Sequence, residues 1–296
     1  MLLLGCGDSE NIDPKDEGGD SCNNLANINA RTITQAATTR EYILHIPDSY
    51  DSSTPTPLLI NFHGFGGCAI DYATDVGEFY NLNEVADIEN FIVVYPQAIV
   101  REKEGAYWDP ADNGAQDISD NDVYFTTQLI ADIDKDYNLD LSRVYAAGYS
   151  NGGMMAYGLA CSGSSFIAAV GIMSGTMLPA TCNTDEYTSI IHFHGIADEV
   201  LPYEGNQDFQ SISSVVDFWL DHNKIDVASL QRTELNNGDV IKEEYTGGAE
   251  NTSLVLYTVN NEYGKEGGHV WFGDSIDGDS PNQILWDFLS QYSLDD

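Results

Sequence analysis

The sequence has few basic residues, few cysteines and no long hydrophobic run. Its 296 residues include 11 Lys and Arg against 48 Asp and Glu, which gives a formal net charge of −37. So negative a surface repels nucleic acid phosphates, and nucleic acid is therefore excluded as an expected partner. No stretch approaches the length of a transmembrane helix. An acidic surface is typical of solubility in salt, and bound cations at clustered carboxylates are the alternative.

The amino terminus carries a short apolar run that ends in a cysteine. Residues 1–6, MLLLGC, resemble the end of a bacterial lipoprotein signal, in which a small residue precedes the cysteine that is lipidated. A truncated signal and an accidental match are both open, and we favour the former. Residues 1–21 are then a signal remnant and an acidic flexible tether. We expect an exported protein, secreted or anchored to the bacterial cell envelope through Cys6, with one domain over residues 22–296.

Four cysteines remain besides Cys6, and their spacing is not that of a metal site. Cys161 and Cys182 flank one strand unit directly after a predicted helix, so we expect a disulfide between them. Cys22 and Cys68 then pair by elimination. Four cysteines allow three connectivities, so the other two remain open. Two disulfides suit an exported protein.

Apolar runs and helical periodicities alternate along the chain. Strands are predicted for residues 40–46, 58–62, 91–95, 144–149, 166–173, 189–194 and 254–259. Helices are predicted for residues 78–88, 122–137, 154–160, 211–222 and 281–292. This alternation predicts an α/β fold whose mainly parallel sheet is covered by helices on both faces. Residues 97–120 have no clear period, which is typical of a functional loop.

A sharp strand-to-helix turn is predicted at residues 148–152, GYSNG. The G-x-S-x-G pattern is typical of a nucleophile elbow, where small residues let the chains pass closely and a strained serine presents its Oγ at the edge of the sheet. The following helix directs its N-terminal N–H groups towards the position of an oxyanion. An ordinary strand-turn-helix corner is the alternative, but the flanking strand and helix patterns favour Ser150 as a nucleophile.

A second glycine-rich turn, HGFGG at residues 63–67, follows the strand at 58–62. Such a turn brings backbone N–H groups close to a ligand without obstruction by side chains, and we assign a second oxyanion donor to Phe65. Alone, this turn would be interpreted as a hairpin or a helix cap. Together with the elbow it predicts an oxyanion hole.

A serine nucleophile needs a base, which a carboxylate orients. His269 follows the last predicted strand and Asp198 directly follows the strand at 189–194, so both fall where α/β sheets place their sites. Asp198 has competitors in Asp185, Asp208, Asp217 and Asp221. The other histidines are His45, His63, His192, His194 and His222. Of these, His192 and His194 alternate within a strand and are interpreted as satisfied core residues.

Several ordered motifs from about Arg40 to the end of the chain resemble one family. They are RVYAAGYSNGGMMAYGLAC (143–161), HGIADEVLPYEG (194–205), GGHVWFG (267–273), HGFGG (63–67) and DNDVYF (120–125). The chain is similar to the secreted bacterial esterases that include polyhydroxybutyrate depolymerase-like proteins and feruloyl esterases. The resemblance implies an α/β-hydrolase fold, a triad of Ser150, Asp198 and His269, and an oxyanion hole from the N–H groups of Phe65 and Asn151. Family members often carry a cysteine directly after His-Gly, whereas here it is displaced to Cys68.

We therefore expect a serine esterase that forms an acyl-enzyme and requires no metal or cofactor. Its expected substrates are small or polysaccharide-linked esters, with feruloyl or acetyl groups, because no separate module for an insoluble polymer is evident. A polyester depolymerase is the first alternative, and a serine peptidase or a non-catalytic binding protein on the same fold are the others. The aromatic residues expected to form a platform for a flat acyl group, with packing as the alternative role, are Phe65, Tyr149, Trp108, Tyr203 and Trp271.

Overall fold

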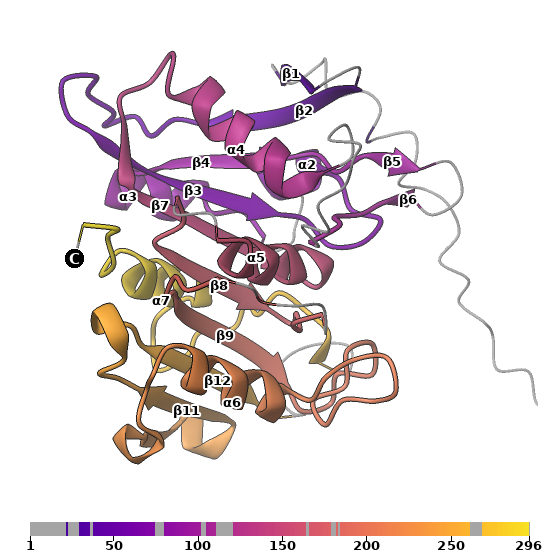
Figure 1. The fold of residues 1–296 in the computed structure, drawn as a ribbon, viewed down its shortest axis with the longest axis vertical. Coiled ribbons are helices and arrows are strands. Elements are labelled where there is room, and N and C mark those ends of the chain that lie inside the picture. The colour runs from indigo at the N-terminus through magenta and orange to yellow at the C-terminus, as the bar shows by residue number, and fades with distance from the viewer. Residues whose placement is uncertain are drawn as a thin grey trace, which may run out of the picture.

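One sheet of ten strands organises the part of the chain that the structure describes (Figure 1). The computed structural model describes residue 22 and residues 30–35, 38–74, 80–101, 105–110, 121–163, 166–178, 182, 184–260 and 268–295. The strand order is β1-β2-β4-β3-β7-β8-β9-β12-β11-β10. The strands are β1 (Arg31–Gln35), β2 (Thr38–His45), β3 (Thr56–Phe62), β4 (Ile92–Pro96), β7 (Leu139–Tyr149), β8 (Ala169–Met173), β9 (Ser189–Gly195), β10 (Gln231–Leu235), β11 (Val240–Tyr245) and β12 (Leu254–Val259).

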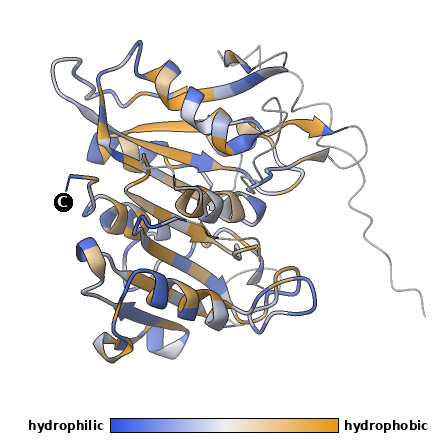
Figure 2. Ribbon diagram, in the orientation of Figure 1, coloured by the Kyte–Doolittle hydropathy of each residue, from blue (hydrophilic) through white to orange (hydrophobic). Residues whose placement is uncertain are grey.

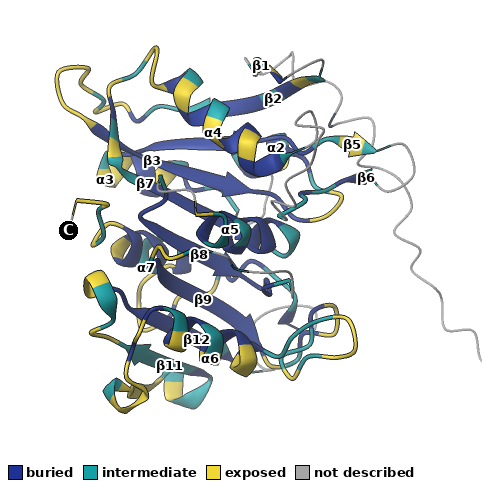
Figure 3. Ribbon diagram, in the orientation of Figure 1, coloured by how far each residue is buried: buried dark blue, intermediate teal, exposed yellow. Residues whose placement is uncertain are grey.

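The six neighbouring strands β4-β3-β7-β8-β9-β12 are parallel. On either side of them, β2 and β11 run antiparallel to this set, and the edge strands β1 and β10 pair antiparallel with β2 and β11. Every residue of β3, β8 and β9 is buried, as the dark centre of Figure 3 shows. Parallel strands covered on both faces need continuous apolar runs, and the central strands are mostly hydrophobic in Figure 2. The predicted mainly parallel sheet is confirmed.

Helices cover both faces of the sheet. One core packs α4 (Asp122–Ile133), α5 (Asn151–Cys161) and α6 (Ile212–His222) against the sheet, and these helices lie in front of it in Figure 1. The other core contains α2 (Ala69–Thr74), α3 (Asn83–Glu89) and α7 (Pro281–Leu289). Alternate residues of β3 feed the two cores, with Leu58 and Ile60 in the first and Leu59 in the second. This is the period-2 alternation of a strand buried on both sides.

Local signals fix where several helices begin. Asn121 caps α4 by accepting a hydrogen bond from the backbone N–H of Tyr124 (2.7 Å). Ser280 caps α7 in the same way, and Pro281 takes the first helical position, where its missing N–H leaves no donor unsatisfied. Ser211 caps α6. These caps start the predicted helices within one or two residues of the expected positions.

The differences from the predicted elements lie mainly at the edges. Strands β1, β10 and β11 were not predicted because they are rich in polar residues and few of their residues are buried. Of the three, β10 is exposed over almost its whole length. The helix predicted from residue 78 begins at Asn83, and residues 75–79 lie outside the described part. Within the loop predicted at 97–120, β5 (Val100–Arg101) pairs antiparallel with β6 (Gly105–Ala106), whereas residues 102–104 and 111–120 lie outside the described part.

Two disulfides join the described cysteines. Cys161, at the end of α5, is bonded to Cys182, which follows β8, and Cys22 is bonded to Cys68 at the start of α2. These are the two expected pairs, and they suit export to an oxidising compartment. Cys6 and residues 1–21 lie outside the described part of the chain. No helix among the described residues is long and apolar enough to cross a membrane.

Candidate active site

A strained turn between β7 and α5 presents Ser150 at the carboxyl ends of the parallel strands. Ser150 has φ 54° and ψ −118°, a left-handed conformation that side chains other than glycine rarely adopt. Its backbone N–H donates to the carbonyl of Met173 at the end of β8 (2.9 Å). A Cβ atom at Gly152 would overlap the carbonyl of Phe62, so only glycine lets α5 pass so close to the end of β3. The elbow is thus held between two neighbouring strands.

His269 joins Ser150 to Asp198. Its Nε2 lies 3.0 Å from the Oγ of Ser150, and its Nδ1 lies 2.8 Å from the Oδ2 of Asp198. Asp198 is only 4% exposed, and His269 is partly buried. None of the competing residues Asp185, Asp208, Asp217 and Asp221 is hydrogen-bonded to His269 within the described part of the chain. The three side chains chosen from the sequence therefore form one hydrogen-bonded path.

The turn after β9 holds the Asp198 carboxylate. Its Oδ1 accepts hydrogen bonds from the backbone N–H groups of Val200 (2.9 Å) and Leu201 (2.7 Å). Burial alone would raise the pKa of Asp198, but hydrogen bonds from His194 and His269 and from the N–H of Leu201 outweigh it and hold the pKa well below its usual value. Asp198 is therefore an ionised, oriented acceptor at neutral pH.

Neighbouring strands fix the backbone around His269. The hydroxyl of buried Ser174, directly after β8, donates to the carbonyl of Val270 (2.7 Å). A Cβ at Gly195 would lie 2.7 Å from the carbonyl oxygen of Gly268, so β9 approaches this loop directly. The Tyr149 hydroxyl donates to the carbonyl of His269 (2.8 Å). Tyr149, expected to contact substrate, thus uses its polar end to hold the histidine loop.

Two backbone N–H groups beside Ser150 have no hydrogen-bond acceptor among the described residues: those of Phe65 and Asn151. Asn151 begins α5, where N–H groups have no partner within the helix. Around Phe65, the N–H of Gly66 donates to the carbonyl of Ala106 in β6 (2.7 Å) and the N–H of Gly64 donates to the hydroxyl of Tyr72 (3.0 Å). The turn is thereby fixed from both sides, while the N–H between these two stays available for a ligand.

Trp108 connects the turn at Ser150 to the HGFGG turn at residues 63–67. The side-chain amide of Asn151 accepts from the N–H of Trp108 (2.7 Å) and donates to its carbonyl (3.0 Å). The indole N–H of Trp108 donates to the carbonyl of His63 (2.9 Å). Because Trp108 is only 1% exposed, its ring packs in the core, and its expected role as an acyl platform is wrong. Its role is to join the two turns that carry the free N–H groups.

The side chain of His63, the first residue of the HGFGG turn, is buried. Its Nδ1–H donates to the carbonyl of Gly64 (2.7 Å), and its Nε2 accepts from the backbone N–H of Ala98 (3.1 Å). Burial lowers the pKa of His63 to about 4. The imidazole is therefore neutral at physiological pH and has one fixed tautomer, which orients the Gly64 peptide next to Phe65.

We expect acid to destabilise the protein through His63. In the unfolded chain this imidazole takes up a proton near pH 6.5, whereas in the folded protein it remains neutral down to about pH 4. Within this window the unfolded state binds more protons than the folded state. The free energy of unfolding therefore decreases as the pH is lowered from about 6.5 to about 4, by on the order of 3 kcal/mol. Burial also lowers the pKa of His192, which adds to the slope.

Urea unfolding between about pH 7 and about pH 4.5 measures this loss of stability. His63→Gln removes one titrating group and should give a shallower dependence on pH. Equal slopes in the two proteins would show that His63 does not contribute.

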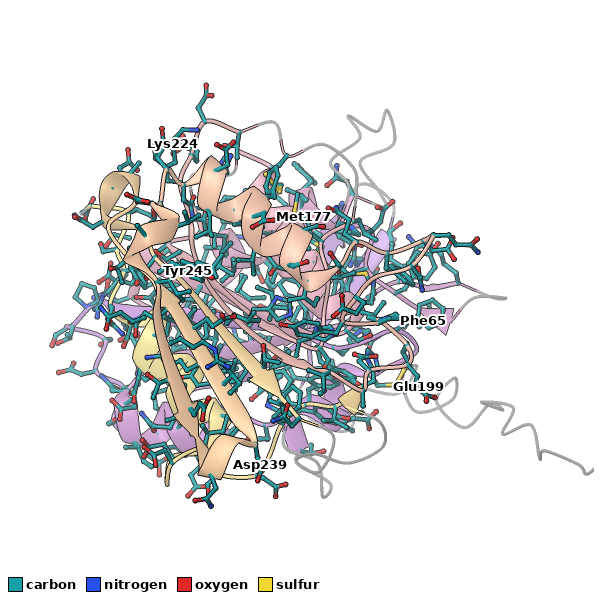
Figure 4. The ribbon with its side chains drawn as sticks, turned by 90° about the horizontal axis from the view of Figure 1, so that it is seen from below. Phe65, Met177, Glu199, Lys224, Asp239 and Tyr245 are labelled. Carbon is teal, nitrogen blue, oxygen red and sulfur yellow. A yellow bond between two sulfur atoms is a disulfide. The ribbon has the colours of Figure 1, made fainter. Side chains whose placement is uncertain are left out.

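An aromatic pair, exposed Phe65 and partly buried Tyr107, borders the HGFGG turn at residues 63–67. The Phe65 ring is 62% exposed and stacks on Tyr107, with 5.7 Å between ring centroids and 14° between planes. The guanidinium of Arg101 lies 4.0 Å from the centroid of Tyr107. Phe65 and Lys224 lie toward opposite sides of the molecule in Figure 4. Tyr107 was not predicted as a site residue.

The remaining expected platform residues are engaged elsewhere. Trp271 is 3% exposed and its indole N–H donates to Asn282 (2.7 Å), so a substrate-facing role for this ring is wrong. The hydroxyl of Tyr203 shares a hydrogen bond with Thr258 in β12 (2.9 Å), and its ring is partly buried. Phe65 and Tyr107 thus present aromatic surface next to the free N–H groups. The partly exposed ring of Tyr149, which lies against Gly64, adjoins the same place.

A parallel sheet with helices on both faces, a nucleophile elbow after a central strand, and acid and histidine loops after later strands define an α/β-hydrolase. The solved structure of the acetyl xylan esterase from Aspergillus awamori has this fold, with a TM-score of 0.60, 16% sequence identity, and coverage of 78% of this chain and 93% of that one.

Sequence comparison then gives the family. The family model described as Esterase PHB depolymerase matches residues 41–220, and the chain belongs to this family. The chain is 27% identical over 270 residues to "Probable feruloyl esterase C" of Aspergillus terreus, covering 90% of this chain and 87% of the relative. It is 26% identical to "Bifunctional acetylxylan esterase/xylanase" of Neocallimastix patriciarum, covering 85% of this chain and 33% of that protein. The chain is a carboxylic ester hydrolase.

Proposed function

We propose that this enzyme hydrolyses feruloyl or related hydroxycinnamoyl esters, and acetyl esters, of polysaccharides, with Ser150, His269 and Asp198 as its catalytic triad in a single domain over residues 22–296. The observation that carries the proposal is the hydrogen-bonded path from Ser150 through His269 to Asp198, next to two unoccupied backbone N–H groups. A nucleophile, a base, an orienting carboxylate and an oxyanion hole are the parts that acyl transfer needs.

In the acylation half, the Ser150 Oγ attacks the ester carbonyl carbon while Nε2 of His269 takes the hydroxyl proton. The carbonyl oxygen becomes an oxyanion and accepts hydrogen bonds from the N–H groups of Phe65 and Asn151. The bond to the alcohol oxygen then breaks, and Nε2–H of His269 returns the proton to the leaving alkoxide. Asp198 holds Nδ1–H of His269 and stabilises the imidazolium between the two transfers.

In the deacylation half, water takes the place of the alcohol. His269 accepts a proton from this water as the water oxygen attacks the acyl carbon. The same two N–H groups receive the second oxyanion. When the acyl–oxygen bond to Ser150 breaks, His269 returns the proton to the Ser150 Oγ, and the carboxylic acid leaves.

The preference for an aromatic acyl group rests on the stacked pair of exposed Phe65 and partly buried Tyr107. Because the N–H of Phe65 is an oxyanion donor, the Phe65 ring stands beside the acyl carbon of a bound ester. A flat hydroxycinnamoyl group can stack there with favourable ring–ring contact, about 0.5–1.5 kcal/mol beyond its buried area. The likeness to feruloyl esterase C supports this class, and the likeness to a bifunctional acetylxylan esterase supports acetyl esters at the same centre.

A polyester of hydroxybutyrate type is the second candidate, and the family match favours it. Such a chain carries no ring for the Phe65–Tyr107 pair to stack on. The aromatic pair therefore favours hydroxycinnamoyl esters over the polyester.

Rates on methyl ferulate, acetylated xylan, p-nitrophenyl esters of graded chain length and a hydroxybutyrate oligomer test the proposal. We expect the highest kcat/KM on methyl ferulate, and we expect Tyr107→Ala to raise KM about five-fold for this ester alone, as loss of about 1 kcal/mol of stacking predicts. Preferential cleavage of the hydroxybutyrate oligomer would reject the hydroxycinnamoyl proposal in favour of the polyester.

For location, we propose an exported enzyme that is either secreted or anchored at the bacterial envelope through lipidated Cys6. The two disulfides support export. The intact mass of protein isolated from a bacterial membrane fraction tests the anchor, since diacylation of Cys6 adds a mass that the unmodified chain lacks.

A further inference from the structure

A chain of hydrogen bonds continues from Asp198 into the core on the side away from His269. Nε2 of His194 lies 3.3 Å from the Oδ2 of Asp198 and 2.8 Å from the carbonyl oxygen of Leu201. Nδ1 of His194 lies 3.1 Å from Nε2 of His192. Nδ1 of His192 lies 2.7 Å from the hydroxyl of Tyr157 in α5. All three side chains are buried.

The Leu201 carbonyl sets the direction of this chain. A carbonyl oxygen only accepts, so Nε2 of His194 carries a proton and donates it to Leu201. The same N–H group lies beside Oδ2 of Asp198, with 3.3 Å between nitrogen and oxygen. Nδ1 of His194 then accepts from Nε2–H of His192, and Nδ1 of His192 accepts from the Tyr157 hydroxyl. Every bond points towards Asp198. The reverse order would leave the Tyr157 hydroxyl proton without an acceptor among the described residues.

Burying two imidazoles in this part of the core costs free energy, because the surrounding side chains are apolar. His192 and His194 lie on the same face of β9 as Ile190, which belongs to the apolar core between the sheet and α4, α5 and α6. The residues paired with His192 across the sheet are Ile172 and Leu256. Two imidazoles at positions suited to aliphatic side chains are expensive to bury, and they are tolerated when every polar atom is paired.

We infer that His194, with His192 and Tyr157 behind it, is a positioning residue that fixes the Asp198 carboxylate for the reaction, a role that rests on the proposed triad. Oδ2 of Asp198 receives N–H groups from both His269 and His194, while Oδ1 receives two backbone N–H groups. The carboxylate therefore cannot rotate away from His269. The second donor on Oδ2 also keeps the shared proton on His269 when the imidazolium forms.

Tyr157→Phe is the first test, because it removes only a hydroxyl three hydrogen bonds away from Asp198. We expect kcat on p-nitrophenyl acetate to fall about three-fold with KM unchanged, as loss of part of one hydrogen bond predicts. The matched control is Tyr145→Phe, which removes another buried hydroxyl, hydrogen-bonded to the carbonyl of Tyr292 (2.8 Å), without a link to Asp198. This control should lower the melting temperature and leave kcat as it was.

His194→Leu removes the donor to Asp198 and should lower kcat about 10- to 100-fold, because a misplaced carboxylate misorients the base. His194→Gln keeps a side-chain N–H and should recover most of that loss. If Tyr157 acts through His194, Tyr157→Phe has no further effect on kcat in the His194→Leu background, although the two losses of stability still add.

Equal effects of Tyr157→Phe and Tyr145→Phe on kcat would overturn the inference, and so would an undiminished three-fold effect in the His194→Leu background. Should His194→Leu not fold, the comparison of the two tyrosine variants decides alone. Ser150→Ala, assayed in parallel, separates failure of this inference from failure of the triad. Retained activity in that variant would reject the triad itself, whereas lost activity with silent Tyr157 and His194 variants rejects only the positioning role.

Discussion

Ser150→Ala and His269→Ala should each reduce kcat on p-nitrophenyl acetate by about 10⁵- to 10⁶-fold, and Asp198→Asn by about 10⁴-fold. Without Oγ there is no attacking atom, and without Nε2 the serine proton has no acceptor at 3.0 Å. Asp198→Asn removes the charge that faces the imidazolium and offers an amide to Nδ1, which favours the wrong tautomer. The residual rate should come from the oxyanion hole and from substrate binding.

These losses should not add, because the three side chains act as a unit. Combining Ser150→Ala with His269→Ala should cost no more than either change alone. A control with the same chemistry is Ser213→Ala, since Ser213 is an exposed serine on α6. Circular dichroism and the melting temperature show whether each variant folds, and labelling by a fluorophosphonate probe shows whether the nucleophile is still activated.

The carboxylate is the part of the triad most open to reassignment, because the chain has 48 acidic residues. Near-full activity of Asp198→Asn would require another carboxylate to reach His269. Asp208→Asn and Asp185→Asn would then be the next variants. With Asp198 as the acceptor at 2.8 Å, both of these should behave as wild type.

The sequence predicted those site residues whose positions follow from the course of the backbone, namely from a glycine pattern or from the end of a buried strand. Ser150 stands in a glycine pattern required by close approach to β3, and Asp198 follows directly after a buried strand. Because parallel strands end at one edge of the sheet, residues that directly follow them converge there. Order along the chain therefore sufficed to bring together side chains 71 residues apart.

The residues that the sequence did not reveal act through partners from distant segments. His194 was interpreted as a core histidine, and its burial agrees, but its contact with Asp198 depends on how the following turn folds back. The Asn151 amide holds Trp108, 43 positions away, through an irregular stretch without a periodic signal. The type of an aromatic residue likewise does not predict whether its side chain is exposed. Trp108 and Trp271 are as aromatic as Phe65, yet only Phe65 of these three reaches the surface.

The edges of the sheet escaped prediction for a related reason. Strand β10 pairs with β11 through backbone hydrogen bonds, while its side chains are largely exposed and carry no alternation. A strand that is held mainly by backbone hydrogen bonds to its neighbour needs no alternation of apolar and polar residues, so its sequence does not reveal it. The buried central strands leave a strong trace, because each must supply apolar side chains to both cores.

Phe65→Pro should lower kcat by about 10²- to 10³-fold, the range for loss of one oxyanion donor. Proline has no backbone N–H, so the substitution removes the atom proposed to receive the oxyanion. Gly64 precedes this position, and glycine tolerates the restriction that proline places on its predecessor. The neighbouring N–H of Gly66 cannot substitute, because it donates to the carbonyl of Ala106 (2.7 Å).

The matched variant is Phe65→Ala, which removes the ring and retains the N–H. On p-nitrophenyl acetate, whose acyl group is too small to stack on the ring, Phe65→Ala should stay within a few-fold of wild type while Phe65→Pro loses two to three orders of magnitude. On methyl ferulate both variants should weaken binding, and only the proline variant should also lose kcat. Equal kcat values for the two variants, with both proteins folded by melting temperature, would move the oxyanion donor away from residue 65 and leave the Asn151 N–H as the one donor supported by its place at the start of α5.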